Sequence, residues 1–322
     1  MNTPPPSPSM ASTYGAWLIS LFVETILYGI GVLQAFLYYQ WWGTDPRSIK
    51  LAVFVVMVLE TVQLCFFFRS SYFRFVQRFG ILQGDLVWSD SLQLFANYLS
   101  AFAVQIFFAT RVYLLTREQA RDFKASLAGI YAVGVLAVLQ LSAGIAQTVL
   151  TYKLRSFSKL DETTAITTLQ TAASLLCDIV ITIHLCFYLA RSKTGLPTTE
   201  RLLKALMINA INRGFLTAIT STMTMILFLV FPHNFWFFLS IAPNSKLYMN
   251  SMLATLNMRG HIWRNAHPNG DWETINLGNM GTHHSTVPQV EFDTLPGSVD
   301  NTDHDSGSIA TKSYHSSAVP SY

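Results

Sequence analysis

The chain has 322 residues, of which 51% are hydrophobic and only 12% are charged, and its formal net charge is +3. Ordinary soluble domains have about 25% charged residues, so the composition excludes a typical soluble protein and predicts a polytopic membrane protein embedded in a lipid bilayer. The basic residues flank apolar segments instead of forming a stripe, which argues against a nucleic-acid partner.

Seven apolar segments follow one another along the chain, each of about 20 to 27 residues, the length that crosses about 30 Å of hydrocarbon. They cover residues 14–39, 48–68, 91–115, 125–150, 164–190, 205–231 and 234–256. This pattern predicts an all-α fold, a bundle of seven transmembrane helices, within a membrane domain over residues 14–264. Residues 1–13 are expected to form an extracellular N-terminal tail.

The distribution of Lys and Arg between the connections predicts the orientation, because cytoplasmic connections are enriched in both. With the N-terminus outside, six basic residues lie in the outer connections: Arg69, Arg74, Arg78, Lys153, Arg155 and Lys159. Twelve lie on the cytoplasmic side: Arg47, Lys50, Arg111, Arg117, Arg121, Lys124, Arg191, Lys193, Arg201, Lys204, Arg259 and Arg264. We therefore expect the N-terminus outside and the C-terminus inside, in the plasma membrane rather than an internal membrane.

The composition changes after about residue 265 to Ser, Thr, Asn, Asp, Gly, Pro and His. Such a segment buries too little apolar surface to order itself, which predicts a disordered cytoplasmic tail over residues 265–322. Its hydroxyl groups could accept phosphate, or the tail could simply aid solubility. Its histidines match no metal-ligand spacing, so we expect no metal site.

Ionisable residues inside apolar segments are costly and point to a functional or structural use. From the 1.5 Å rise per helical residue, four of them are expected at about one depth in the bilayer: Glu60, Asp178, Arg213 and Lys246. At that depth the two acids could pair with the two bases. Glu24 lies nearer the outside. We predict a hydrated polar core that Asn side chains extend. The candidate residues are Glu60, Asp178, Arg213, Lys246, Glu24, Asn209, Asn212 and Asn250.

This polar core has three interpretations. It could hold the helices in register through hydrogen bonds and ion pairs, it could form a ligand pocket or signalling switch, or it could conduct ions or protons. The third is the weakest, because no chain of acids connects the two faces.

Two further functions are disfavoured by particular positions. A lysine in a seventh helix suggests retinal, but Ala242 stands where a microbial-type counter-ion would lie four residues before Lys246. We therefore expect no cofactor. No His-rich metal box, Ser/His/Asp arrangement or phosphate-binding glycine loop occurs, so we expect no enzymatic activity.

Several segments together resemble one family: "LYGIGVLQAFLYYQ", "QIFFATRVYLL", "CDIVITIHLCFYL", "INRGFLTAITS" and "SKLYMNSMLATLNMRG". They look like the seven-helix membrane proteins of mushroom-forming (basidiomycete) fungi that end in the domain DUF6534, here over approximately residues 175–264. The closing "LYMNSMLATLNMR" is similar to the family ending Y-x-N-S-L-L-A-T-L-N-x-R, with Met252 where leucine is usual. The resemblance implies a multi-pass membrane protein and no established activity.

Two functional hypotheses remain. In the first, the protein is receptor-like, and the charged residues form a bistable network that a small-molecule ligand or a cytoplasmic signalling partner shifts. In the second, it is a transporter or channel-like protein that uses the same charges as a path.

The orientation leads to a testable prediction. An epitope fused to the C-terminus should survive protease added outside intact cells, because that end is expected in the cytoplasm. An epitope placed after Met1 is the matched control and should be removed. Loss of the C-terminal epitope from intact cells would contradict the assignment.

Overall fold

The structure is a computed structural model that describes residues 11–41, 45–79, 85–118, 123–156, 159, 162–192, 197–230 and 235–266. All of these residues belong to one compact unit, Met1–Pro268. Apart from residues 11–13 and 265–266, the predicted N-terminal and C-terminal tails lie outside the described residues.

Over the described residues the fold is all-α, as predicted, and contains seven α-helices. They are α1 (Ala16–Trp41), α2 (Arg47–Tyr72), α3 (Trp88–Glu118), α4 (Phe123–Leu154), α5 (Thr164–Arg191), α6 (Pro197–Val230) and α7 (Phe238–Ala266). Three short helical segments adjoin them: η1 (Ala11–Gly15), η2 (Phe73–Gln77) and η5 (Phe235–Phe237). Each of the seven predicted apolar segments overlaps one of these helices. The predicted first segment begins in η1, the sixth extends one residue past α6, and the seventh begins before α7, whereas the other four lie within their helices.

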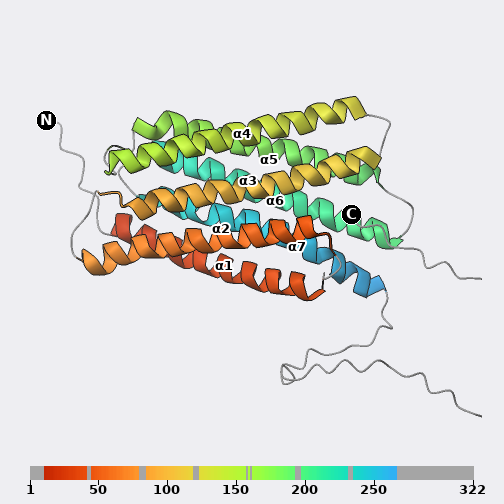
Figure 1. Cartoon of the computed structure of the whole chain (residues 1–322), viewed down its shortest axis with the longest axis horizontal. Helices are drawn as coiled ribbons and strands as arrows, with labels where there is room; N and C mark the ends of the chain where they lie inside the picture. Colours follow the sequence, from red (N-terminus) through yellow and green to blue (C-terminus); the bar gives the residue numbers. More distant parts are fainter. Residues whose placement is uncertain are drawn as a thin grey trace, which may run out of the picture. The chain divides into compact units, whose positions relative to one another are not determined.

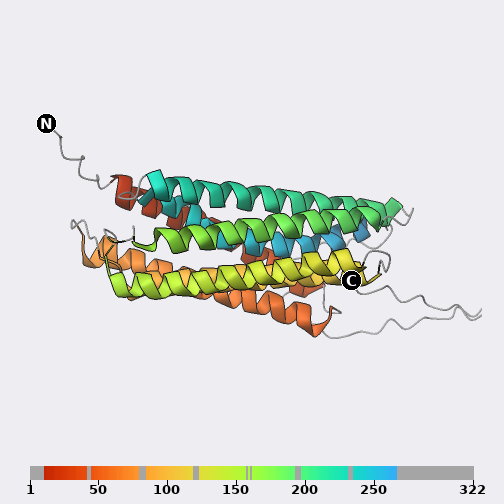
Figure 2. The ribbon, with the colours of Figure 1, turned by 90° about the horizontal axis from the view of Figure 1, so that it is seen from above.

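The seven helices run side by side along a common direction (Figure 1; Figure 2). Successive helices pack against each other, and α7 closes the bundle by packing against α1. Helix α7 also contacts α2 and α3, so it meets helices on several of its sides. We call the end where α1, α3, α5 and α7 begin the N-face, and the opposite end the C-face.

Five helical segments are long and apolar enough to cross a membrane: Thr13–Trp41, Arg47–Gln77, Trp88–Arg117, Ala128–Leu154 and Thr164–Arg191. A multi-pass membrane protein is therefore confirmed. Helices α6 and α7 are not among these five segments, which were sought in the described part of the chain. Each contains a buried basic residue, Arg213 in α6 and Lys246 in α7, together with several Asn, Ser and Thr residues.

The bundle is apolar outside and partly polar inside. Large apolar side chains such as Phe22, Phe54 and Phe215 are exposed on the outer surfaces of their helices. Many Ser, Thr, Gln and Asn side chains are buried between the helices. This is the polarity expected for a bundle surrounded by lipid, where apolar surface is stable outside and polar groups associate inside.

Apolar residues fill the interior at both ends. One core cluster near the N-face contains Trp17, Phe67 and Phe238, whose rings pack against each other. A larger cluster extends towards the C-face. Its buried members include Tyr38, Val53, Val56, Phe108, Val112, Met249, Met252, Leu253 and Leu256.

Helices α3 and α4 approach closely at Gly144, and this contact gives a test of the packing. A Cβ atom added there would lie 2.6 Å from Cδ2 and 2.7 Å from Cγ of the Tyr98 ring. The ring is held because the Tyr98 hydroxyl donates a hydrogen bond of 2.7 Å to Gln147. Gly144→Ala should therefore lower the free energy of unfolding by about 1–3 kcal/mol through overpacking.

Gly134 on the same helix is the matched control, because a Cβ atom there would meet nothing within 4 Å. Gly134→Ala should be neutral or stabilise by up to about 1 kcal/mol, since alanine favours helix. Denaturant unfolding of the purified protein in detergent micelles measures both. Equal effects of the two substitutions would contradict the close approach.

Candidate functional site

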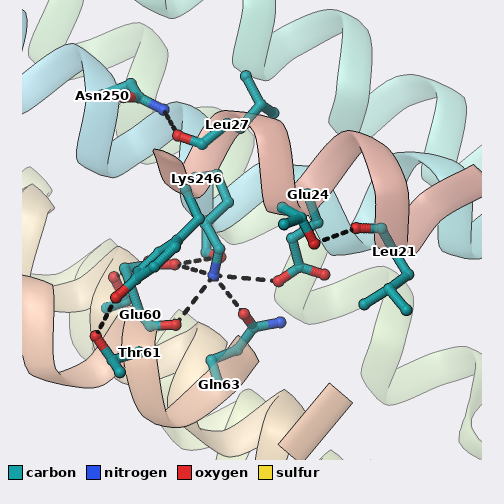
Figure 3. A network of polar contacts seen from close by, with 12 residues as sticks. Leu21, Glu24, Leu27, Glu60, Thr61, Gln63, Lys246 and Asn250 are labelled. Carbon is teal, nitrogen blue, oxygen red and sulfur yellow. Dashed lines mark hydrogen bonds and ion pairs between the residues drawn. The ribbon is translucent and has the colours of Figure 1, made fainter. Parts of the chain in front are cut away.

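Lys246 of α7 lies inside the bundle with its side chain fully buried and meets two carboxylates (Figure 3). Its Nζ lies 2.5 Å from Oε2 of Glu60 on α2 and 3.1 Å from Oε1 of Glu24 on α1. The same ammonium donates a hydrogen bond to Oε1 of Gln63. Since a buried charge is stable only when paired, these three side chains explain how an apolar bundle accommodates a lysine.

The two carboxylates of this Lys246 network are in different environments. Glu60 accepts hydrogen bonds from Ser100 on α3, from Ser245 at 3.0 Å and from Lys246. Glu24 is fully buried, its Oε1 meets Lys246 at ion-pair distance without hydrogen-bond geometry, and its Oε2 has no hydrogen-bond partner. Two acids therefore face one base, and Glu24 is the less satisfied of the two.

A second buried network joins α5, α6 and α7. Nη2 of Arg213 lies 2.8 Å from Oδ1 of Asp178, and the Tyr248 hydroxyl donates to Oδ2 of the same carboxylate. The hydroxyls of Ser174 and Tyr248 are 3.1 Å apart. The Arg213 guanidinium also lies over the Phe108 ring, 3.9 Å from its centroid, a favourable cation–π contact.

The two networks lie on different sides of α7. Lys246 and Tyr248 are two residues apart, which places their side chains about 200° apart around a helix with 3.6 residues per turn. Lys246 therefore reaches α1 and α2, whereas Tyr248 reaches α5. Helix α7 is therefore joined by buried polar contacts to α1 and α2 on one side and to α5 on the other.

This arrangement corrects the predicted charge layer in two respects. The charged residues pair as Lys246 with Glu60 and Glu24, and as Arg213 with Asp178, so they form two networks instead of one. Of the two acids expected at the depth of Lys246, only Glu60 pairs with it; Asp178 does not, because it lies on the other side of α7.

The three asparagines of the predicted core also differ. Asn209 donates a hydrogen bond of 2.6 Å to Thr255, and Asn250 donates one of 2.9 Å to the backbone carbonyl of Leu27. These two amides connect α7 to α6 and to α1. Asn212 is exposed on α6 and does not join the core, because it lies about 100° around the helix from the buried Arg213.

Several members of the networks were not predicted from the sequence. Gln63, Ser100, Ser174, Ser245 and Tyr248 are neutral polar residues in apolar segments, and such residues are too common there to single out. Their only sequence signal is polarity inside a predicted span.

Two further ion pairs lie at the ends of the bundle. At the N-face, Arg74 is buried, pairs with Asp90 at 2.5 Å and lies 4.3 Å from the centroid of the Trp17 ring. Arg74 is one of the basic residues that the sequence placed in an outer connection. At the C-face, Arg259 pairs with Asp45 at 2.6 Å, and Tyr38 donates to the same carboxylate at 3.2 Å.

Small cavities extend from the N-face into the bundle. An outer cavity of about 340 Å³ is lined in part by Leu86 and Thr151. Both residues also line an inner cavity of about 30 Å³, which shares Gln93 and Ile241 with a third of about 10 Å³. A fourth, of about 20 Å³, lies between α3, α5, α6 and α7. A water molecule needs about 10–15 Å³ of such volume, so the inner cavities are water-sized.

Both networks are built around ion pairs between acidic and basic side chains. Lys246 pairs with both Glu24 and Glu60, and Arg213 pairs with Asp178, so each carboxylate already contacts a basic side chain. Over the described residues, no group of three or more His, Cys, Asp or Glu side chains has metal-binding geometry.

Replacing Lys246 tests the first network. Lys246→Met should lower the free energy of unfolding by about 3–5 kcal/mol, because it leaves two buried carboxylates without their cation. Lys204→Met is the matched control: this lysine is exposed on α6, and its loss should change the melting temperature little. Thermal unfolding of the purified proteins gives the comparison. An unchanged melting temperature for Lys246→Met would refute the pairing.

Residues 174–261 match the sequence model of a family of unknown function, DUF6534. The match includes Asp178, Arg213 and Lys246, and it confirms the predicted resemblance for this part of the chain. The family description names no activity. A search of curated proteins found no match, and a search of solved structures found none either.

Proposed function

We propose that this protein is a receptor-like membrane protein in which α7 moves between two arrangements and ligand binding selects one of them. In this proposal all seven helices span the plasma membrane, with the N-face outside and the C-face in the cytoplasm. The chain carries out no catalytic step. It binds a ligand near one face and presents the change to a cytoplasmic partner at the other.

The lengths and surfaces of α6 and α7 support seven spans. Helix α6 has 34 residues and α7 has 29; at about 1.5 Å per residue they are long enough to cross about 30 Å of hydrocarbon. The outer face of α6 exposes Ile208, Ile211, Phe215 and Ile219. Its polar residues Arg213 and Thr217 point inwards, so α6 presents an apolar surface to lipid.

The observation that carries the proposal is that α7 is joined to both halves of the bundle by buried charge networks on different sides. Buried ion pairs are strongly destabilised when one partner is removed, so intermediate positions of the helix are disfavoured. Helices packed in this way adopt discrete arrangements, which is the property a switch needs. A ligand that contacts α7 then affects both networks together.

The fourth cavity is the best candidate for the ligand. Its lining includes Asn97, Tyr98, Gln170, Thr171 and Asn244, all neutral groups that form hydrogen bonds. Such a lining suits a small uncharged molecule with several hydrogen-bonding groups. At about 20 Å³ it must widen to admit one, and α7 contributes both Ile241 and Asn244 to its wall. Ligand binding and α7 movement are thereby coupled.

The interior between Lys246 and the C-face favours a receptor-like function over a transporter or channel. Between Lys246 and the C-face, the bundle contains a cluster of buried apolar side chains, among them Val53, Val56, Met252 and Leu256, and its polar groups form separate pairs such as Asn209 with Thr255. A transporter or channel of this fold would need polar groups or water through that layer. A receptor needs the layer closed, so that only the helix movement is transmitted.

The test combines a ligand screen with a position sensor. Small uncharged molecules are screened for those that raise the melting temperature of the purified protein. A hit should lose its effect in Asn244→Ala, which removes an amide from the cavity, and keep it in Asn212→Ala, whose amide is exposed on the lipid side of α6.

The same hits are then added to protein carrying a fluorescent label at residue 204, near the C-face end of α6. The receptor-like proposal expects a ligand-dependent change in its fluorescence. Stabilising ligands that leave the label unchanged would overturn the proposal. If vesicles containing the protein take up the ligand, the protein is a transporter and the receptor-like proposal is wrong.

A further inference from the structure

The Lys246 network contains more negative than positive charge. Glu24 and Glu60 contribute two carboxylates, Lys246 one ammonium, and all three side chains are fully buried. With both acids ionised, the site would have a net charge of −1 in a region of low dielectric. An uncompensated buried charge costs several kcal/mol, so a further positive charge is required there.

The contacts identify which carboxylate takes that charge. Glu60 is held as a carboxylate by donors from Ser100, Ser245 and Lys246. Glu24 is contacted by Lys246 and Gln63, but neither of its carboxylate oxygens makes a hydrogen bond of good geometry. Glu24 lines none of the four cavities described above, so the positive charge that we assign to it is the smallest one, a proton.

We propose that Glu24 is a proton-binding site, connected to the N-face by a row of water-sized cavities, which makes the bundle responsive to pH at that face. This inference goes beyond the receptor-like function and does not depend on it. Binding adds one proton from water to the Glu24 carboxylate, which becomes a carboxylic acid. The net charge of the network changes from −1 to zero; one O–H bond forms on Glu24, and one breaks in the hydronium ion that supplies the proton and is left as water.

The charged groups around Glu24 are those of the network itself. Lys246 faces it from α7 and Glu60 from α2. The other two segments packed against α1, η1 and η5, contain no charged residue. Protonation of Glu24 is therefore governed by one ammonium and one carboxylate.

The cavities lie in a row between the N-face and this site, and neighbouring cavities share wall residues. The outer cavity and the first inner cavity share Leu86 and Thr151. The first and third cavities share Gln93, Leu94, Phe238 and Ile241.

Gln63 links the end of this row to the proton site. It lines the third cavity, accepts a hydrogen bond from Lys246 and lies beside Glu24 (Figure 3). Its side chain thus separates the last cavity from Glu24.

Unpartnered polar atoms support a water-filled route. Oε1 of Gln93 and Oγ1 of Thr151 are buried and have no hydrogen-bond partner in the protein. Both side chains line the cavities just described. Buried polar atoms are nearly always satisfied by protein or by ordered water, so these two positions indicate where water binds. The three cavities lie on the N-face side of the network and end at Gln63, which makes the route one-sided.

Infrared difference spectroscopy of the purified protein at high and low pH tests the proton site. The wild type should show the C=O band of one buried carboxylic acid that appears as the pH falls. Glu24→Gln should lack it and take up one proton fewer. If Glu24→Gln does not fold, Glu24→Asp should keep the band with an altered position. A band unaffected by every substitution at residue 24 would overturn the proposal.

The route has its own pair of variants. After a rapid pH jump, Gln93→Leu should slow the appearance of the band by about tenfold or more, an added barrier of about 1.4 kcal/mol. Gln105→Leu is the matched control, because Gln105 is buried on the same helix, bonds to Gln140 and lines none of these cavities. Equal rates in the two variants would overturn the N-face route, even if Glu24 is confirmed as the site.

Discussion

The burial of Lys246 is the constraint on which the arrangement of the bundle depends. An ammonium cannot remain charged in an apolar interior unless acids and hydrogen-bond acceptors surround it. Glu24, Glu60 and Gln63 meet this need, and they come from α1 and α2, far from α7 in the sequence. Satisfying one side chain therefore brings three helices together and determines which side of each faces inwards.

The same physics explains why the most polar helices are central. In lipid, apolar surface gains little by association, and helices are held together by packing and by polar contacts. Helix α7 carries Lys246, Tyr248 and Asn250, which between them contact α1, α2 and α5. Helices α6 and α7 are less uniformly apolar than the others because they supply the contacts that hold the bundle together.

The charged residues of the candidate site could be predicted from the sequence, but only some of their pairs could be. Charge inside an apolar segment is a strong signal, and it identified Glu24, Glu60, Asp178 and Arg213 together with Lys246. Pairing depends on the direction in which each side chain points around its helix axis. The depth of a residue in the membrane does not give this direction. Neighbouring residues differ by about 100° in direction, which is why Arg213 is buried while Asn212 is exposed.

The sequence by itself determined the class of protein, its helical elements and the residues whose burial requires a partner, because hydrophobicity, length and charge are local properties. The tertiary structure decided the rest. It divided the charges into two networks, placed two carboxylates against the single ammonium of Lys246, and placed Gln93 and Thr151 beside a water-sized cavity. These features arise where side chains from distant helices meet, so no single segment of the chain contains them.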